Sequence, residues 1–510
     1  MIERLVPAKN GFTVYVEEIA LHSRYNPAEE AERYIASLKL ESNRSIILLE
    51  PGLFYLERAI QKAFPQMRII TLHCSAFFSP ENPALGCQPG SLSWNPASPE
   101  DLEDFLERVS GEDGDTIRLI EWRPSINAYG KACVDLAART VECIRRISAN
   151  RVTVKNFGRR WLSNALRNMD LLGNAAEIQA GSAPVVICAA GPGLEDALDT
   201  ISRWKESPAP PLIIAVSSAV PALVYRGIIP DLVNTTDGGG WALFHLVEDY
   251  RLMSGINKKQ ANPAADQTSG LPILAADQTS GLPILAAALT AALPSQAAGE
   301  PILILSDGSL WQEVLLQAFG LPFVRFPQRG TVSASALDLA RFLSTGSIYL
   351  AGLDFSHRDI KTHASPYAFE KLLNRSASRF FPFYSRTFER SRTINTSGSH
   401  GIYAVWFKTR LETLSNEGAE LFSLGPSALG IPPAGPLPGS GSGGIMPRFI
   451  YGNRRLPPGS GKKRARDLLL EALTNPLTAR QIGKELGELL GSTKPEDTDT
   501  VRNELLDLYG

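Results

Sequence analysis

A chain of 510 residues with 44% hydrophobic and 20% charged residues is long enough for two or three domains with sizeable cores. Its 51 basic and 53 acidic residues nearly cancel, so the overall charge favours neither nucleic acid nor a membrane surface as a partner. The N-terminus lacks signal-peptide features, no run reaches the ~20 apolar residues of a membrane span, and the 5 cysteines form no CxxC pair. We therefore expect a reduced, cytoplasmic protein with no membrane span, no disulfide framework and no zinc site.

Residues 1–135 predict an α/β domain. An amphipathic helix is predicted at residues 29–35, and apolar strands at residues 45–49 and 67–72 flank a glycine-containing turn and a second helical pattern. This order is typical of a βαβ unit in a parallel sheet. Residues 136–180 are mostly helical, and we expect them to connect this domain to the next.

The βαβ order is clearest in residues 181–375. Helices are predicted at residues 194–204 and 219–226, and Gly227 offers the second helix a left-handed end without steric cost. The predicted buried strands are residues 184–190, 212–216, 230–237, 302–305 and 347–352. The fold class is therefore α/β, with a doubly wound, Rossmann-like central domain.

Residues 264–276 and 275–287 are identical in sequence. Two perfect copies do not make a solenoid, which needs at least three repeats. We interpret them as an in-frame duplication in a surface loop, because such loops tolerate insertions at low entropic cost. We expect no function there.

The composition changes near the C-terminus. Residues 376–424 predict helices that close the core, residues 425–460 a linker rich in Gly, Pro and Ser, and residues 461–510 a small helical extension. A basic run at residues 459–466 fits a solvated helix start better than a nucleic-acid site, because no nucleic-acid-binding motif accompanies it.

The turn Gly191-Pro192-Gly193 follows a predicted buried strand and precedes a helix. Backbone amides and the positive helix end favour a phosphate there, and the glycines let a ligand approach the backbone. The alternative is an ordinary tight turn without a ligand. A dinucleotide such as NAD is disfavoured, because GxGxxG is incomplete and no acidic residue ends the next strand.

Three further residues are candidates for catalysis. Asp237 and Asp354 each follow a predicted strand of the same sheet, where ligands of open α/β sheets bind. Either acid could act as a base or hold Mg²⁺, and Asp237 could instead cap the following helix. His363 lies a short loop after Asp354 and could complete a base-and-orienter pair.

Four small residues are candidates for contacting a nucleotide. Ser217 closes the second predicted strand of the central domain, and Gly330, Thr331 and Ser333 begin a helix that could receive an anion or a sugar. Thr331 or Ser333 could equally act as the N-cap of that helix.

Together these motifs resemble the core of the motility-associated factor (Maf) glycosyltransferases, a core shared with the archaeal MptE-like 6-hydroxymethylpterin diphosphokinases. The core motifs, in chain order, are Ala190-Gly191-Pro192-Gly193-Leu194, Gly227-Ile228-Ile229-Pro230-Asp231 with Asp237, Gly330-Thr331-Val332-Ser333, Gly352-Leu353-Asp354 and Thr362-His363-Ala364. The flanking residues of the resemblance are Ser23-Arg24-Tyr25-Asn26-Pro27, Trp161, Asn164, Asn168, Tyr403 and Trp406. The likeness covers roughly residues 10–415.

The resemblance implies transfer of a nonulosonic acid, such as pseudaminic or legionaminic acid, from a CMP-sugar to Ser or Thr of flagellin. It implies that Gly191, Pro192 and Gly193 cradle the nucleotide phosphate, that Asp237 and Asp354 line the cleft, and that His363 moves a proton or contacts phosphate. No tightly bound cofactor is implied, although Mg²⁺ suits the two acids. The family usually reads Gly-x-Gly-Pro-Ser-Leu, so Ala189 and Gly193 are departures from its pattern.

Two alternatives remain beside the transferase. A diphosphokinase would pass pyrophosphate from ATP to a hydroxymethyl pterin, with carboxylates holding Mg²⁺. A non-catalytic relative would serve flagellar assembly or export. The length of the chain beyond the core favours the transferase over the kinase.

Overall fold

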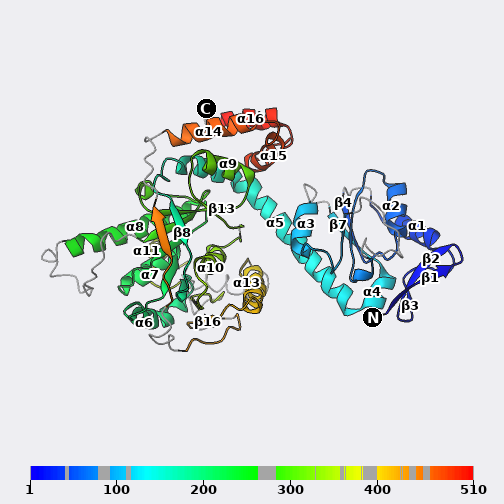
Figure 1. The fold of residues 1–510 in the computed structure, drawn as a ribbon, viewed down its shortest axis with the longest axis horizontal. Coiled ribbons are helices and arrows are strands. Elements are labelled where there is room, and N and C mark those ends of the chain that lie inside the picture. Colours follow the sequence, from blue (N-terminus) through cyan, green and yellow to red (C-terminus); the bar gives the residue numbers. More distant parts are fainter. Residues whose placement is uncertain are drawn as a thin grey trace. The chain divides into compact units, whose positions relative to one another are not determined.

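The computed structural model of the chain describes most of the sequence. The described residues are 2–40, 45–78, 92–110, 117–261, 283–327, 329–355, 361, 363–380, 382, 399–425, 427, 429–435, 444–451 and 460–508. They divide into an N-terminal unit, Met1–Val154, and a C-terminal unit, Lys155–Gly510 (Figure 1). The boundary lies within helix α5 (Lys131–Asn168), a single 38-residue helix that continues from one unit into the other, and it falls inside residues 136–180, where the sequence predicts a helical connection.

The N-terminal unit contains the predicted parallel sheet and an antiparallel sheet that the sequence did not reveal. The parallel strands, in spatial order, are β6 (Leu92–Trp94), β5 (Arg68–Leu72), β4 (Ser45–Leu49) and β7 (Ile117–Glu121). The antiparallel strands are β1 (Glu3–Ala8), β2 (Gly11–Val16) and β3 (Ile19–Ala20). The helices that accompany them are α1 (Pro27–Ser37), α2 (Tyr55–Ala63), α3 (Leu102–Ser110) and α4 (Arg123–Tyr129).

Local sequence explains where these elements begin. The Asn26 side chain accepts a hydrogen bond from the Glu29 amide, and Pro27 at the first helical position starts α1. Ala31 and Ile35, spaced by four residues, form the buried face of this helix. All five residues of β4 are buried, as expected for a central strand covered on both sides.

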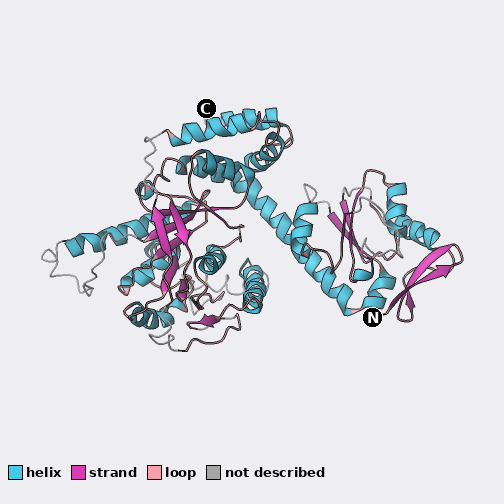
Figure 2. Cartoon of the chain, viewed as in Figure 1, coloured by secondary structure: helices cyan, strands magenta, loops and turns pink. Residues whose placement is uncertain are grey.

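The C-terminal unit is built on one parallel sheet of 8 strands, which lie among helices (Figure 2). In spatial order the strands are β14 (Val324–Arg325), β13 (Ile302–Ser306), β12 (Ile284–Ala288), β11 (Leu232–Thr235), β10 (Leu212–Val216), β9 (Val185–Cys188), β15 (Ile348–Ala351) and β16 (Leu421–Ser423). The principal helices are α6 (Leu194–Lys205), α7 (Val220–Tyr225), α8 (Gly240–Ala261), α9 (Leu310–Ala318), α10 (Val332–Leu343), α11 (Glu370–Ser376) and α13 (Ser399–Asn416). The predicted α/β class with a doubly wound centre is therefore confirmed.

The duplicated sequence contributes to this sheet. Strand β12 consists largely of the end of the second copy, and Leu285 and Ala286 within it are buried. The prediction of a surface loop without a structural role was therefore wrong for residues 284–287, which pair with β11 and β13. The first copy lies outside the described residues.

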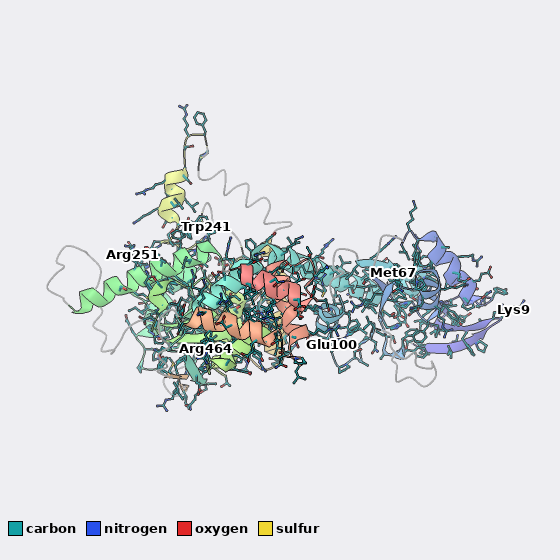
Figure 3. All side chains as sticks on the ribbon, turned by 90° about the horizontal axis from the view of Figure 1, so that it is seen from above. Lys9, Met67, Glu100, Trp241, Arg251 and Arg464 are labelled. Carbon is teal, nitrogen blue, oxygen red and sulfur yellow. The ribbon has the colours of Figure 1, made fainter. Side chains whose placement is uncertain are left out.

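The C-terminal region also differs from the prediction. Strand β17 (Arg448–Tyr451), within the predicted linker, pairs with β8 (Ala176–Gln179), and β16 extends the sheet beyond residue 375. Helices α14 (Gly461–Ala472), α15 (Ala479–Leu490) and α16 (Thr498–Asp507) share the core of the C-terminal unit rather than forming a separate extension. Arg464, labelled in Figure 3, lies 5.0 Å from the Phe319 ring, so the basic run belongs to a packed helix start.

None of the described helices is sufficiently long and hydrophobic to pass through a bilayer.

Candidate functional site

The strand order places the candidate site at a switch in the direction of the sheet. From β9 the chain builds outward through β10 to β14, and it then returns to add β15 on the other side of β9. Loops that leave the carboxyl ends of two such strands diverge, and ligands of open α/β sheets bind in the crevice between them. The turn Gly191-Pro192-Gly193 follows β9 and Asp354 follows β15, so both lie at this point.

The glycine turn and Asp354 are bonded directly to each other. The Gly193 amide donates to Asp354 Oδ2 at 2.7 Å, and the Gly191 amide donates to the Gly352 carbonyl at 2.9 Å. Pro192 has no amide hydrogen. Two amides that could have cradled a phosphate are therefore occupied by protein acceptors, and the predicted cradle role of this turn stays a prediction.

Close packing explains why this turn contains two glycines. A Cβ on Gly191 would lie 2.4 Å from both Asp354 Oδ2 and the Gly352 carbonyl oxygen. A Cβ on Gly193 would lie 2.2 Å from Asp354 Oδ1. The departure from serine at position 193 therefore has a structural cause, because the Asp354 carboxylate fills the space that a serine Cβ would need.

Asp237 lies elsewhere along the same edge of the sheet. It is exposed, and its Oδ1 accepts a hydrogen bond from the Gly239 amide at 2.7 Å, just before α8 begins. This bond closes a turn two residues before α8 and does not make Asp237 the N-cap of that helix, because an N-cap side chain accepts from an amide two or three residues further on, inside the helix. Strands β10 and β9 lie between β11 and β15, which places the strands preceding the two acids about 14 Å apart.

The position of the two acids bears on a metal site. Among the described residues, no group of three His, Cys, Asp or Glu side chains is arranged to hold a metal ion. Both Asp237 and Asp354 bind backbone amides in this structure. Mg²⁺ binding by these two acids therefore stays a prediction, without a third side-chain ligand among the described residues.

His363 lies close to the glycine turn. The amide of its neighbour Ala364 donates to the Ala190 carbonyl at 2.9 Å, and the His363 ring lies 5.2 Å from that of Tyr367. Lys361 and the Ser365 amide both bind the Glu195 carboxylate at the start of α6. These contacts hold the histidine loop against the end of β9.

A second histidine, which the sequence did not single out, lies near His363. Burial, and secondarily the charge of His363, lowers the pKa of His245 on α8 to about 4, so His245 is neutral at physiological pH. Its ring packs 4.7 Å from Phe369, and its Nδ1 atom is buried without a hydrogen-bond partner. Trp241, on the same helix, packs on Phe369 too and lies beside α11 (Figure 3).

Thr331 is the N-cap of α10. Its hydroxyl accepts a hydrogen bond from the Ala334 amide at 3.1 Å, which settles the capping alternative for this residue. Gly330 has a φ of +74°, and a Cβ there would lie 3.3 Å from the Tyr403 ring, so the helix start packs against α13. Ser333 lies in the first turn of α10, and Ser217 is buried after β10.

Buried polar groups at the end of β11 form a further part of this edge. Asn234 donates from Nδ2 to the Val332 carbonyl at 2.9 Å, which ties β11 to α10. Asn234 Oδ1 and Thr235 Oγ1 are buried without hydrogen-bond partners. Sequence reasoning missed both residues, because only their place at the end of a central strand distinguishes them.

Three residues that flank the core motifs of the family resemblance lie on α5 and contact the loops at this edge of the sheet. They are Asn164, Asn168 and Trp161. Asn164 donates to the Gly238 and Thr290 carbonyls, and Asn168 donates to the Leu289 and Ala291 carbonyls at 2.8 Å each. Trp161 packs where a Cβ on Gly238 would be. These α5 side chains therefore position the loops after β11 and β12.

A charged cluster connects α10 with α13. Asp338 binds Arg329 at 2.8 Å and Arg410 at 3.1 Å, and the Arg329 guanidinium lies 5.5 Å from the Trp406 ring. Trp406 and Tyr403 thus have packing roles beside the α10 start.

Comparison with known proteins identifies part of the chain. Residues 159–259 match the family model described as 6-hydroxymethylpterin diphosphokinase MptE-like. An uncharacterized protein of Treponema pallidum (strain Nichols) is 30% identical over 257 residues, which are 50% of this chain and 50% of that protein. The match thus spans about half the length of that relative.

One similar solved structure is a Maf glycosyltransferase from Magnetospirillum magneticum AMB-1. It is 12% identical with a TM-score of 0.46, over 99% of this chain and 90% of that chain. The family match spans β9 to α8 and so includes the glycine turn, Ser217 and Asp237, whereas Asp354 and His363 lie outside it. Over residues 159–259 the chain is therefore similar to the MptE-like family, as its core motifs predicted.

Proposed function

We propose that this protein is a glycosyltransferase of the Maf type, which transfers a nonulosonic acid from a CMP-sugar to Ser or Thr of flagellin. The MptE-like domain and the ordered motifs that continue beyond it support this proposal. The observation that carries it is the meeting of the glycine turn, Asp354 and the His363 loop at the switch between β9 and β15.

The chemistry of glycosyl transfer asks two things of such a site. The departing nucleotide phosphate must be stabilised, and the acceptor hydroxyl must lose a proton. The start of α6 presents its positive end beside the glycine turn, and Glu195 holds the Lys361 ammonium near it. A carboxylate and an imidazole, from Asp354 and His363, are the side chains positioned to accept the proton.

Phosphate binding and proton acceptance are coupled in this proposal. Asp354 occupies the Gly193 amide, so a phosphate at the turn competes with its carboxylate. Donor binding would therefore turn the carboxylate away from the amide and present it as a base. The acceptor would be deprotonated only when the donor is present, which limits wasteful reaction with water.

Pyrophosphoryl transfer to a hydroxymethyl pterin is the second candidate, because the matching family model carries that activity in its description. It requires carboxylates that hold Mg²⁺ between the phosphates. The separation of β11 and β15 by two strands makes Asp237 and Asp354 poorly placed to share one ion. The geometry therefore favours the transferase.

A thermal-shift panel separates the candidates. We expect CMP and a CMP-nonulosonate to raise the melting temperature, because a ligand that binds only the folded state stabilises it. A shift with ATP and a pterin but not with CMP compounds would replace the transferase by the kinase. No shift with any of these ligands would favour a non-catalytic relative.

The Asp237→Asn variant tests whether this second acid, which follows β11 rather than β15, takes part in the reaction. We expect loss of flagellin modification with the free energy of unfolding unchanged within about 0.5 kcal/mol, because asparagine can still accept the Gly239 amide. Asp199→Asn on α6 is the matched control, since Asp199 is 77% exposed in a surface ion pair. Wild-type modification by Asp237→Asn would remove Asp237 from the mechanism.

A further inference from the structure

The N-terminal unit has a switch point of its own. Among the strands of its parallel sheet, β4 comes first in the sequence and β7 comes last. In space, however, β4 lies between β5 and β7. Glu50 directly follows β4, and His73 and Cys74 directly follow β5. Ionisable and nucleophilic side chains thus gather where the loops of this sheet diverge.

Glu50 organises the cluster. Its side chain is fully buried, and its backbone has a φ of 45°, a left-handed conformation that non-glycine residues rarely adopt. One carboxylate oxygen lies 3.1 Å from His73 Nδ1, and the other accepts the Cys74 amide at 2.5 Å. Strained backbone at a buried polar cluster is typical of a functional position.

The Cys74 thiol meets a second thiol there. Cys74 Sγ lies 3.3 Å from Cys133 Sγ, although the two residues are 59 positions apart in the sequence. Cys74 is partly exposed, whereas Cys133, near the start of α5, is fully buried. The Cys74 sulfur is thus accessible to an external reagent, whereas the Cys133 sulfur is buried next to it.

We propose that Cys74 and Cys133 are a redox-active pair, oxidised to a disulfide by a low-molecular-weight disulfide. The Cys74 thiolate attacks one sulfur of the external disulfide, whose S–S bond breaks and releases one thiolate. The Cys133 thiol loses its proton to solvent, and its sulfur then attacks Cys74 Sγ and displaces the second external thiolate. The two cysteines lose two electrons and two protons, and the external disulfide is reduced to two thiols.

The surroundings determine how such a pair behaves. The hydrogen bond with Cys133, burial and the Glu50 charge all raise the pKa of the Cys74 thiol well above its ordinary value. A disfavoured thiolate makes the exchange slow, because the thiolate is the nucleophile. It also slows reduction of the disulfide, because a sulfur whose thiolate has a high pKa is a poor leaving group.

The bond would have a structural consequence. It would tie the loop after β5 to the start of α5, the helix that continues into the C-terminal unit. A cross-link that closes a loop of this length restricts the unfolded chain and stabilises the folded one. We expect the apparent melting temperature of the N-terminal unit to rise by about 5 °C on oxidation.

Exposure of the full chain to glutathione disulfide tests the proposal. In a Cys87→Ser background, we expect mass spectrometry to show a peptide linked through Cys74 and Cys133, together with loss of two thiols that dithiothreitol restores. Cys133→Ala should stop at a mixed glutathione disulfide on Cys74, and Cys74→Ser should form neither product. Cys143→Ser and Cys188→Ser, at other buried thiols, are the matched controls.

Three results would overturn the proposal. One is an unchanged thiol count in the folded protein, after exposure sufficient to oxidise the same cysteines in the urea-unfolded chain. Another is a mixed disulfide on Cys74 that persists although Cys133 is present. The third is a cross-link that uses Cys143 or Cys188.

A second variant tests the role of the carboxylate. Glu50→Gln keeps an acceptor but removes the negative charge, so the Cys74 pKa should fall and the exchange should accelerate. The expected gain is about threefold for each unit of pKa, because nucleophilicity falls as the thiolate becomes more abundant. An unchanged or lower rate in a folded Glu50→Gln protein would exclude Glu50 as the group that tunes the pair.

Discussion

The two parallel sheets of this protein both place a carboxylate at a switch point of the strand order, but they hold it with different backbone and side-chain arrangements. In both, a strand that comes late in the chain packs beside the first strand of the sheet, β7 beside β4 and β15 beside β9, and a carboxylate lies at the resulting switch. In the C-terminal unit the acid, Asp354, comes from the returning strand and fits into a turn of glycines. In the N-terminal unit the acid, Glu50, follows the first strand and adopts a left-handed backbone without glycine.

The two switches differ in what surrounds the carboxylate, which is the backbone of a glycine turn in one unit and a histidine and a cysteine in the other. Glycines after β9 leave backbone amides that a phosphate can compete for. After β4 and β5, the Glu50 carboxylate is enclosed by His73 and Cys74, and the neighbouring thiols meet each other. The same topology therefore supports different chemistry, because function depends on side chains at the edge rather than on strand order.

The largest expected effect tests whether the turn after β9 needs its glycines. Gly191→Ala should lower the free energy of unfolding of the C-terminal unit by more than about 3 kcal/mol, because its Cβ meets a backbone carbonyl that cannot easily move. Chemical denaturation would measure this. Gly240→Ala is the control, since no atom lies within 4 Å of a Cβ there. Equal stability of the two variants would show that the turn does not need its glycines.

The next effect tests the buried carboxyl group of Glu57 in the N-terminal unit. Burial raises the pKa of Glu57 on α2 from 4.5 to about 7, and its Oε2 has no hydrogen-bond partner. Between these values the folded state binds more protons than the unfolded state, so stability falls as pH rises through this window. The loss above pH 7 should be on the order of 2–3 kcal/mol.

Glu57→Gln should remove most of that loss, and hydrogen exchange of β4 would report it locally. The comparison of variant with wild type is needed because other groups also titrate. Burial lowers the pKa of His22 to about 3, which costs stability below pH 6.5, and burial raises the pKa of Asp249 in the C-terminal unit. An identical pH profile for Glu57→Gln and wild type would contradict the prediction.

The smallest effect concerns the duplicated sequence. Deletion of residues 265–275 leaves the same residues leading into β12, so the free energy of unfolding should change by less than about 1 kcal/mol. Leu285→Ala is a contrasting variant, because it empties a buried position of β12 and should cost about 2–5 kcal/mol. Unfolding of the deletion variant would contradict this prediction and show that the fold needs both copies.

Much of the candidate site could be predicted from the apolar runs in the sequence and from the glycines and acids that follow them. Apolar runs placed β4, β9, β10 and β15 correctly, and the glycine turn, Thr331 and the two strand-end acids were visible beside them. Thr331 proved to be the N-cap of α10, whereas Asp237 closes the turn that leads into α8. Strand β12 was missed because its alanines and the repeat around it resemble a loop.

The sequence by itself determined the buried strands with uninterrupted apolar runs and the turns that follow them, because apolar periodicity and glycine act locally. Only the tertiary structure decided which residues at the ends of different strands and helices lie in contact. The bond from Gly193 to Asp354 spans 161 residues, and the contact of Cys74 with Cys133 spans 59. These pairs depend on the order in which strands pack, and that order is set by crossover connections and the shared core rather than by any local pattern.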